Sequence, residues 1–245
     1  MKLLAFDTST DSLSVAVSDG GRVWQHSGPG GAKASASLIP AVLDLLEQAG
    51  LTLAGLDALV FGRGPGSFTG LRTACSVAQG LALGAGRGSG IPVLPVDTLL
   101  ALAEEARFQR QGAAGTASWQ VTALLDARMD EMYVQRFRFD GGSWSSLAPC
   151  ALVRPEDLQL APEDAQLAGN VFGVYAGRLP PWPQAVQTVA ALPTAAALLR
   201  LAPPLLQAGG GMSAALALPL YIRDKVAFTT DERAQAKAQA AAAAP

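Results

Sequence analysis

The chain has 245 residues, half of them apolar, and a formal net charge of −2. That length accommodates two small α/β domains, and the apolar content is sufficient to fill buried cores. A protein that grips nucleic acid by itself normally carries a basic patch or stripe, and because no cluster of Lys and Arg stands out here, we expect any RNA to be held by a partner.

The first half of the chain predicts one α/β layer. Three strands are expected over Lys2–Phe6, Leu13–Val17 and Val23–His26, as a meander with a hairpin at an Asp-Gly-Gly turn. Apolar residues at helical spacing then predict a helix over Leu38–Ala49, with Ser37 as its cap. The remaining elements are a strand over Leu56–Phe61, a helix over Phe68–Leu83, a strand over Ile91–Val96 and a helix over Leu99–Phe108.

The second half predicts a shortened repeat of this unit, opening with a meander whose turn is again Asp-Gly-Gly. Its expected elements are strands over Gln120–Asp126, Met132–Phe139, Ser145–Leu152 and Gln166–Val171, and a helix over Thr194–Leu206. We therefore expect a first α/β lobe over residues 1–108, which contains the partner-binding helices, and a reduced second lobe over 109–228. The last segment of the second lobe could pack back on the first, and an alanine-rich tail follows over 229–245.

Three polar residues directly follow the first strand. The carboxylate of Asp7 could bind Mg²⁺ or a nucleophilic water, and the hydroxyl and backbone groups of Thr8 and Ser9 could approach a phosphate. The alternative is that these residues only end the strand in an Asx-turn. We favour the Asx-turn because so short a segment carries little specific information.

The block Gly62–Arg72 is the most distinctive segment of the chain. Its four glycines within nine residues allow unusual backbone angles and close backbone approach. Because the loop leads into a helix, its N–H groups could receive an anion, although the Gly-Lys-Ser/Thr ending of a P-loop is missing. The alternative is a tight loop for close helix packing. That alternative is favoured by a face of small side chains on the following helix, formed by Gly70, Thr73, Ala74, Val77, Gly80 and Gly84.

Few residues suit hydrolytic chemistry or a metal site. His26 is the only histidine, which leaves no H-x-x-x-H pair, disfavours a metallopeptidase and restricts any Ser-His-Asp triad to this residue. We expect it to be exposed. The charged cluster Asp126–Glu131 could coordinate Mg²⁺, but a structural pair of Asp126 and Arg128 at a hairpin is favoured. We therefore predict no catalytic residue and no metal ligand.

The cysteines and the apolar segments narrow the class of protein further. Cys75 and Cys150 lack C-x-x-C spacing, so neither a disulfide framework nor a thiolate metal site is indicated. The chain starts with an apolar strand pattern without a basic stretch before it, so no signal peptide is expected. Its apolar runs are also shorter than a membrane span. These features predict a soluble, cytoplasmic protein without a membrane partner.

Together, the motifs resemble the TsaB (YeaZ) family, bacterial proteins of tRNA threonylcarbamoyladenosine synthesis related to TsaD. The matching stretches span nearly the whole chain to about residue 228, and the glycine-rich block is long enough to be specific. They are Leu4–Thr10, Leu38–Pro40, Phe61–Arg72, Gln79–Leu81, Asp126–Arg128 and Pro219–Val226. The resemblance implies an α/β, actin/hexokinase-like (ASKHA) fold of two related lobes, the second of them reduced.

The resemblance also implies a role as a non-catalytic partner subunit. Proteins of this family bind the related catalytic subunit TsaD. Together with an ATPase, TsaE, they support transfer of a threonylcarbamoyl group from its adenylate to adenosine 37 of certain tRNAs. The chain would thus bind and activate a TsaD-like subunit and meet tRNA only through the complex. No tightly bound cofactor is implied, although ATP or ADP with Mg²⁺ could lie at the complex interface.

In this family two helices of the first lobe form the association surface, and by position these are the helices over Leu38–Ala49 and Phe68–Leu83. The residues expected to bind the partner are Leu38, Val42, Leu46, Gly70, Arg72, Thr73, Ala74, Val77 and Leu81. The same surface could serve a homodimer of the free chain. The alternative function is an ATP-dependent phosphotransferase or a weak nucleotide-binding protein on the same fold, with Asp7, Thr8 and Ser9 at the nucleotide.

Overall fold

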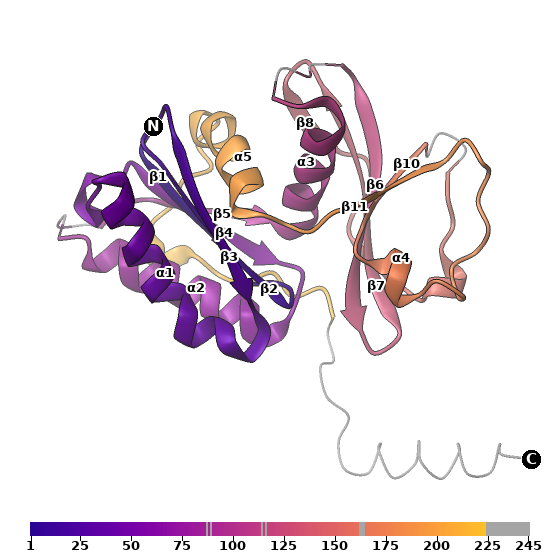
Figure 1. Ribbon diagram of the computed structural model, residues 1–245, viewed down its shortest axis with the longest axis horizontal. Helices are drawn as coiled ribbons and strands as arrows, with labels where there is room; N and C mark the ends of the chain where they lie inside the picture. Colours follow the sequence, from indigo (N-terminus) through magenta and orange to yellow (C-terminus); the bar gives the residue numbers. More distant parts are fainter. Residues whose placement is uncertain (87, 89, 114, 116, 162–164, 224–245) are drawn as a thin grey trace, which may run out of the picture.

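The computed structural model describes residues 1–86, 88, 90–113, 115, 117–161 and 165–223. The chain forms two α/β lobes, each built on one sheet, with helices between the sheets and outside them (Figure 1). This confirms the α/β class and the two-lobed arrangement. The predicted alanine-rich tail over 229–245 lies outside the described residues, as do the last three positions of the matching stretch Pro219–Val226.

The first sheet has the strand order β3-β2-β1-β4-β5. Strands β1 (Leu3–Asp7), β2 (Ser12–Ser18) and β3 (Val23–Pro29) form the predicted antiparallel meander. Strands β4 (Ala58–Gly64) and β5 (Val93–Asp97) continue the sheet parallel to β1. Every residue of β1 is buried, because helices cover both faces of the sheet, and this is why the central strands are continuous apolar runs.

Helices α1 (Ala34–Ala49) and α2 (Phe68–Gly84) cover the outer face of the first sheet (Figure 1). The predicted bounds of α2 are nearly correct, but α1 begins four residues earlier than predicted. Its N-cap is Lys33, so the prediction of Ser37 as the cap is wrong. Pro40 consequently lies inside the helix, where it removes one backbone hydrogen bond.

Helices α3 (Thr98–Gln111) and α5 (Ala195–Gln207) lie between the two sheets (Figure 1). Helix α3 follows the first sheet in sequence, yet it buries Leu99, Leu102 and Ala106 in the core of the second sheet. Helix α5 belongs to the second half, yet it packs on β1 and β2 of the first sheet. The predicted lobe boundary at residue 108 therefore does not separate the two packed units, because α3 and α5 each pack on the sheet of the other lobe.

A buried ionic network joins the two exchanged helices. Glu104 of α3 is only 2% exposed, and its carboxylate accepts hydrogen bonds from Arg107 and, at 2.8 Å, from Nε of Arg200 on α5. The second amino group of Arg200 donates to Glu105 at 2.7 Å. Because removing one partner of a buried pair leaves an uncompensated charge, this network favours one arrangement of α3 against α5.

The second sheet has the order β11-β10-β6-β7-β8, and β9 also pairs with β7. Its strands are β6 (Trp119–Arg128), β7 (Glu131–Asp140), β8 (Ser143–Ser146), β9 (Ala151–Val153), β10 (Gln166–Gly169) and β11 (Gln187–Ala190). The single strand predicted over Ser145–Leu152 is thus two short strands at opposite ends of β7, separated at Pro149, which lacks a backbone donor. Strand β10 ends before the predicted Val171, which begins the short helix α4 (Val171–Val174).

The described C-terminal segment returns to the first lobe. Met212 forms a β-bridge with Val93, the turn Ala214–Leu216 packs on α2, and the N–H of Leu220 donates to the carbonyl of Arg63 at 2.7 Å. The last segment therefore lies where the sequence suggested. No helix in the described part of the chain is long and apolar enough to cross a membrane.

Candidate functional site

The turn after β1 and the glycine-rich loop after β4 pack directly against each other. A Cβ atom on Gly62 would lie 1.8 Å from Oδ2 of Asp7, and one on Gly70 would lie 1.9 Å from the carbonyl oxygen of Thr8. The hydroxyl of Thr8 in turn donates to the carbonyl of Gly70 at 2.7 Å. Only glycine leaves room for these contacts. The turn after β1 and the glycine-rich loop therefore form one closely packed unit.

The other glycines of the loop serve the same purpose. A Cβ on Gly66 would lie 2.6 Å from the backbone oxygen of Ser9, to which Ser67 N–H donates at 2.7 Å. Gly64 has a φ of +122°, which disfavours other residues, and its Cβ would lie 2.5 Å from the carbonyl oxygen of Leu220. The chain itself thus occupies the space beside each glycine, as the close-packing interpretation predicted.

The carboxyl group of Asp7 is enclosed in this packing unit. Ser9 donates to its Oδ1 from the backbone N–H at 2.8 Å and from the hydroxyl at 2.6 Å, which is the predicted Asx-turn. Oδ2 is buried, with no hydrogen-bond partner among the described residues. Burial raises the pKa of Asp7 to about 6, although both bonds from Ser9 oppose the shift.

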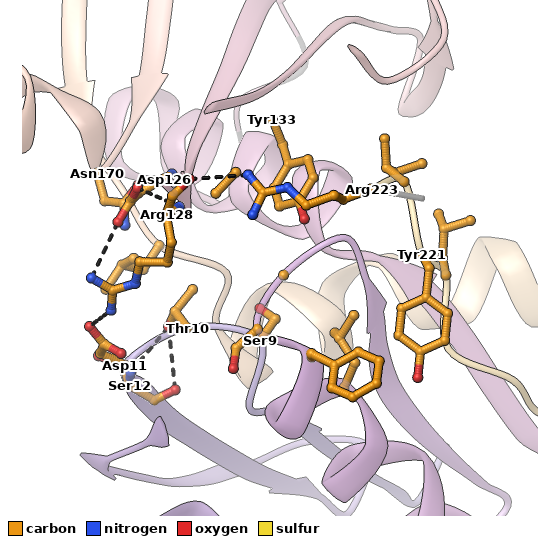
Figure 2. A pocket seen from close by; sticks show the side chains of 18 residues that line it. Ser9, Thr10, Asp11, Ser12, Asp126, Arg128, Tyr133, Asn170, Tyr221 and Arg223 are labelled. Carbon is orange, nitrogen blue, oxygen red and sulfur yellow. Dashed lines mark hydrogen bonds and ion pairs between the residues drawn. The ribbon is translucent and has the colours of Figure 1, made fainter. Parts of the chain in front are cut away.

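A cavity of about 550 Å³ lies between the two lobes (Figure 2). It is bounded by the turn after β1, the start of α2, the β6–β7 hairpin and the C-terminal segment. Its lining residues include Ser9, Asp11, Ser67, Phe68, Asp126, Arg128, Tyr133, Tyr221 and Arg223. Of the predicted nucleotide-binding residues only Ser9 lines the cavity. Thr8 bonds to Gly70 and Asp7 faces Gly62.

The tip of the β6–β7 hairpin forms the opposite wall of the cavity. Arg128, Met129 and Asp130 have φ values of 62°, 56° and 61°, a left-handed conformation that costs residues with side chains about 1–2 kcal/mol each. The surrounding structure compensates for this strain through hydrogen bonds to the hairpin. Tyr175 donates from its hydroxyl to Oδ1 of Asp126 at 2.7 Å, and burial, together with this bond, raises the pKa of Tyr175 above its usual range.

Arg128 connects the hairpin to the first lobe (Figure 2). Its guanidinium pairs with Asp11 beside the β1 turn and lies 3.5 Å from the carboxylate of Asp126. The side chain of Arg223 donates to the carbonyl of Arg128 at 3.1 Å and to Glu131 at 2.6 Å. The predicted structural pair of Asp126 and Arg128 is therefore confirmed. Among the described residues, no group of three or more His, Cys, Asp or Glu side chains could hold a metal ion.

The structure corrects the choice of partner-binding residues. Five of the nine are buried: Leu38, Val42, Leu46 and Ala74 in the core between α1, α2 and the first sheet, and Gly70 against the backbone of Thr8. The side chains of the first four face the chain's own sheet, because the apolar face that a helical period reveals is the face that packs internally. Arg72 is exposed, and Thr73, Val77 and Leu81 are partly exposed, so these four remain available to a partner.

A second set of apolar residues was missed by the sequence reasoning and lies on the surface. It consists of Ile39 (42% exposed), Leu43 (52%), Phe68 (36%), Leu83 (58%), Leu216 (68%), Leu218 (70%) and Tyr221 (43%). They are seven of the eleven large apolar residues exposed in the described part of the chain, and they belong to α1, α2 and the C-terminal segment. We call this set the exposed apolar set. The sequence did contain a signal for this set, namely the helical spacing of Ile39 and Leu43 next to the buried residues of α1.

His26 is exposed on the edge strand β3, as predicted. The carboxylates of Asp11 and Asp126 pair with Arg128, and the carboxyl group of Asp7 lies against Gly62. Of these contacts, the pair of Asp11 and Arg128 joins the two lobes.

The family model of TsaD, described as tRNA N6-adenosine threonylcarbamoyltransferase, matches residues 30–244. The tRNA threonylcarbamoyladenosine biosynthesis protein TsaB of Escherichia coli K12 is 33% identical over 237 residues, covering 93% of this chain and 97% of its own. This chain belongs to the TsaB family. The TsaB protein of Haemophilus influenzae Rd is likewise 33% identical over 238 residues, covering 93% and 96% of the two chains.

Solved structures of TsaB-family proteins show the same fold. YeaZ from Pseudomonas aeruginosa superimposes with a TM-score of 0.76 and 39% identity, over 90% of this chain and 99% of its own. A second Pseudomonas aeruginosa structure, described as an uncharacterized protein with similarity to peptidase YEAZ, has the same identity and TM-score over 91% and 99%. With the TsaD match, these structures confirm the actin/hexokinase-like fold expected for a TsaB protein.

Proposed function

We propose that the chain is a non-catalytic subunit that binds and activates a TsaD-like threonylcarbamoyltransferase, which modifies adenosine 37 of tRNA. Membership of the TsaB family, whose relatives are named for tRNA threonylcarbamoyladenosine biosynthesis, supports this pathway. The observation that carries the partner role is the exposed apolar set. Exposed apolar side chains that gather on one set of elements are typical of protein–protein interaction sites.

The outer side of α2 fits close docking of a second protein. Ser76 and Gly80 are exposed there, and a Cβ atom on Gly80 or Gly84 would meet nothing within 4 Å. Small side chains let helix axes approach closely, since the side chains at the contact set the interaxial distance. Thr73 and Leu83 flank these positions. The glycine-rich loop supports the same role, because it holds the start of α2 tightly against the β1 turn.

The proposal includes the other components of the system. A TsaE-like ATPase joins the complex in the cytoplasm, and tRNA is bound through the complex, consistent with the net charge of −2. ATP or ADP with Mg²⁺ binds at the complex interface and not tightly to the free chain. The free chain uses the exposed apolar set to form a homodimer, which competes with the TsaD-like subunit for the same residues.

Reconstitution tests this proposal. The full chain is co-expressed with the TsaD-like subunit of its own organism, and complex formation is measured by size-exclusion chromatography with light scattering. Threonylcarbamoyl transfer to tRNA is then assayed with each protein alone and with both, in the presence of the ATPase. We expect a complex, and transfer only when both proteins are present. Transfer by this chain alone, or no complex at all, would contradict the proposal.

The interlobe cavity favours a second candidate function, a weak nucleotide-binding protein or ATP-dependent phosphotransferase. Its volume of about 550 Å³ lies within the range of small-molecule sites, and Ser9, Ser67 and Arg128 offer polar groups to a phosphate. Against this candidate, Asp7 faces Gly62 and not the cavity. Calorimetric titration of the free chain with ATP and Mg²⁺ separates the two candidates, because the partner role predicts no stoichiometric binding.

A further inference from the structure

Arg72, in the second turn of α2, is exposed to solvent and contacts Phe68 and Tyr221 of the exposed apolar set. Its guanidinium lies 3.8 Å from the centre of the Phe68 ring, and its Nε donates to the hydroxyl of Tyr221 at 3.1 Å. The rings of Phe68 and Tyr221 lie 5.4 Å apart. Within the described residues no carboxylate pairs with Arg72, whereas Arg63, Arg107, Arg128, Arg178, Arg200 and Arg223 all have such partners.

These contacts orient the cation before any partner arrives. With Nε bonded to Tyr221 and the guanidinium carbon held over the Phe68 ring, the two terminal amino groups of Arg72 are left for a ligand. Two parallel N–H groups match the geometry of a carboxylate, which can accept both at once. A side chain that is already held in place also loses less conformational entropy when it binds.

Exposed leucines extend this site along α2. Gln79 donates to the carbonyl of Ala217 at 3.0 Å, and Tyr221, four residues later, contacts the start of the same helix. The segment from Ala217 to Tyr221 therefore runs antiparallel to α2. Leu218, between the two anchoring contacts, is 70% exposed and Leu216 is 68% exposed. Large apolar side chains beside an oriented arginine have the composition of an interaction hot spot.

The charges on this surface favour a protein partner over RNA. Neither α2 nor residues 212–223 contain an acidic residue, so the surface offers one oriented cation and apolar area. RNA backbones are normally bound by several cations together, and here Arg72 stands among leucines and aromatic rings. A protein segment that carries a carboxylate beside apolar side chains is the complementary partner.

We propose that Arg72, Phe68, Tyr221 and Leu218 form a docking site for an acidic, apolar segment of the TsaD-like subunit. The proposal rests on the proposed function and adds the chemistry by which the partner is recognised. In the complex, the partner's carboxylate accepts both terminal amino groups of Arg72, and its apolar side chains cover Leu216 and Leu218.

Two surface variants and two matched controls test the docking site. Arg72→Glu reverses the charge and Leu218→Ser removes exposed apolar area. Arg154→Glu and Val174→Ser make the same kinds of change at exposed positions of the second lobe. We expect the Kd of the full chain for the TsaD-like subunit to rise about tenfold or more for each test variant, since hot-spot residues contribute well over 1.4 kcal/mol. Both controls should keep the wild-type Kd, and all four variants should keep the wild-type melting temperature.

The other possible results distinguish a failure of the proposed function from a failure of the docking site alone. If the wild-type chain does not bind the subunit, the proposed function is wrong. If the wild type binds and Arg72→Glu and Leu218→Ser bind equally well, only the docking site is wrong. Loss of tRNA binding by the Arg72→Glu complex at an unchanged Kd for the subunit would assign the arginine to RNA phosphate and overturn the proposal. Arg72→Lys, which keeps the charge but not the paired amino groups, should weaken binding by an intermediate factor, and a wild-type Kd for it would refute the bidentate contact.

Discussion

The two walls of the interlobe cavity are built by opposite means. On the first lobe, the β1 turn is buried and held by close contacts with glycines, so that Asp7, Thr8 and Ser9 are at most 2% exposed. On the second lobe, the β6–β7 hairpin has a strained backbone and is held by ion pairs, several of them exposed to solvent. The first wall thus depends on shape and the second on charge. Steric fit tolerates almost no change, whereas exposed charge pairs contribute little each.

The largest expected effect is a loss of stability in Gly70→Ala. A Cβ atom at this position would lie 1.9 Å from the backbone oxygen of Thr8, which cannot move without displacing β1 or α2. We expect the free energy of unfolding to fall by about 3 kcal/mol or more, or the protein not to fold. Chemical denaturation of the purified variant measures this loss.

Gly80→Ala on the same helix is the control for that experiment. A Cβ there would meet nothing within 4 Å, so only helix propensity changes, and we expect a gain of about 1 kcal/mol. If both alanine variants had the same stability, the β1 turn would not depend on the fit of the glycine loop.

A smaller effect concerns the pH dependence that Asp7 causes. Burial raises its pKa from 3.8 to about 6, so between these values the folded chain holds a proton that the unfolded chain has released. Stability therefore falls as the pH rises from 4 to above 6. Two pKa units correspond to a loss of about 3 kcal/mol at most, of which thermal unfolding at pH 4 and pH 7.5 should show a part.

Asp7→Asn removes the titrating group at nearly constant shape. The variant should lose the component of pH dependence that lies between pH 4 and pH 7, while the acidic groups elsewhere continue to titrate. An unchanged difference between the two pH values in Asp7→Asn would mean that another group causes it.

The smallest effect is expected at the charged wall. Arg128 and Asp11 have side chains 64% and 75% exposed, and exposed pairs typically contribute less than about 1 kcal/mol. A double-mutant cycle with Arg128→Ala and Asp11→Ala should give a coupling below that value, decreasing further in 1 M NaCl because salt screens exposed charges. A coupling of several kcal/mol, insensitive to salt, would show that this wall is as tightly built as the first.

The sequence predicted most of the local structure correctly, because its signals are local. Helix α2 was expected over Phe68–Leu83 and extends to Gly84, since a glycine-rich loop precedes it and apolar spacing continues to its end. The Asx-turn at Asp7 and the pairing of Asp126 with Arg128 were also favoured from residue type alone. Errors occurred at the ends of elements: no side chain caps the start of α1, and β8 and β9 are divided at Pro149.

The sequence by itself determined the α/β class, the meanders and the glycine-rich loop, because hydrophobic periods and turn residues act over a few positions. Only the tertiary structure decided that α3 and α5 exchange sheets and that the periodic face of α1 and α2 is internal. A helical period shows that a face is buried but does not say against what. The surface that remains for a partner, including Arg72 beside Tyr221 from 149 positions later, exists only once the chain has folded.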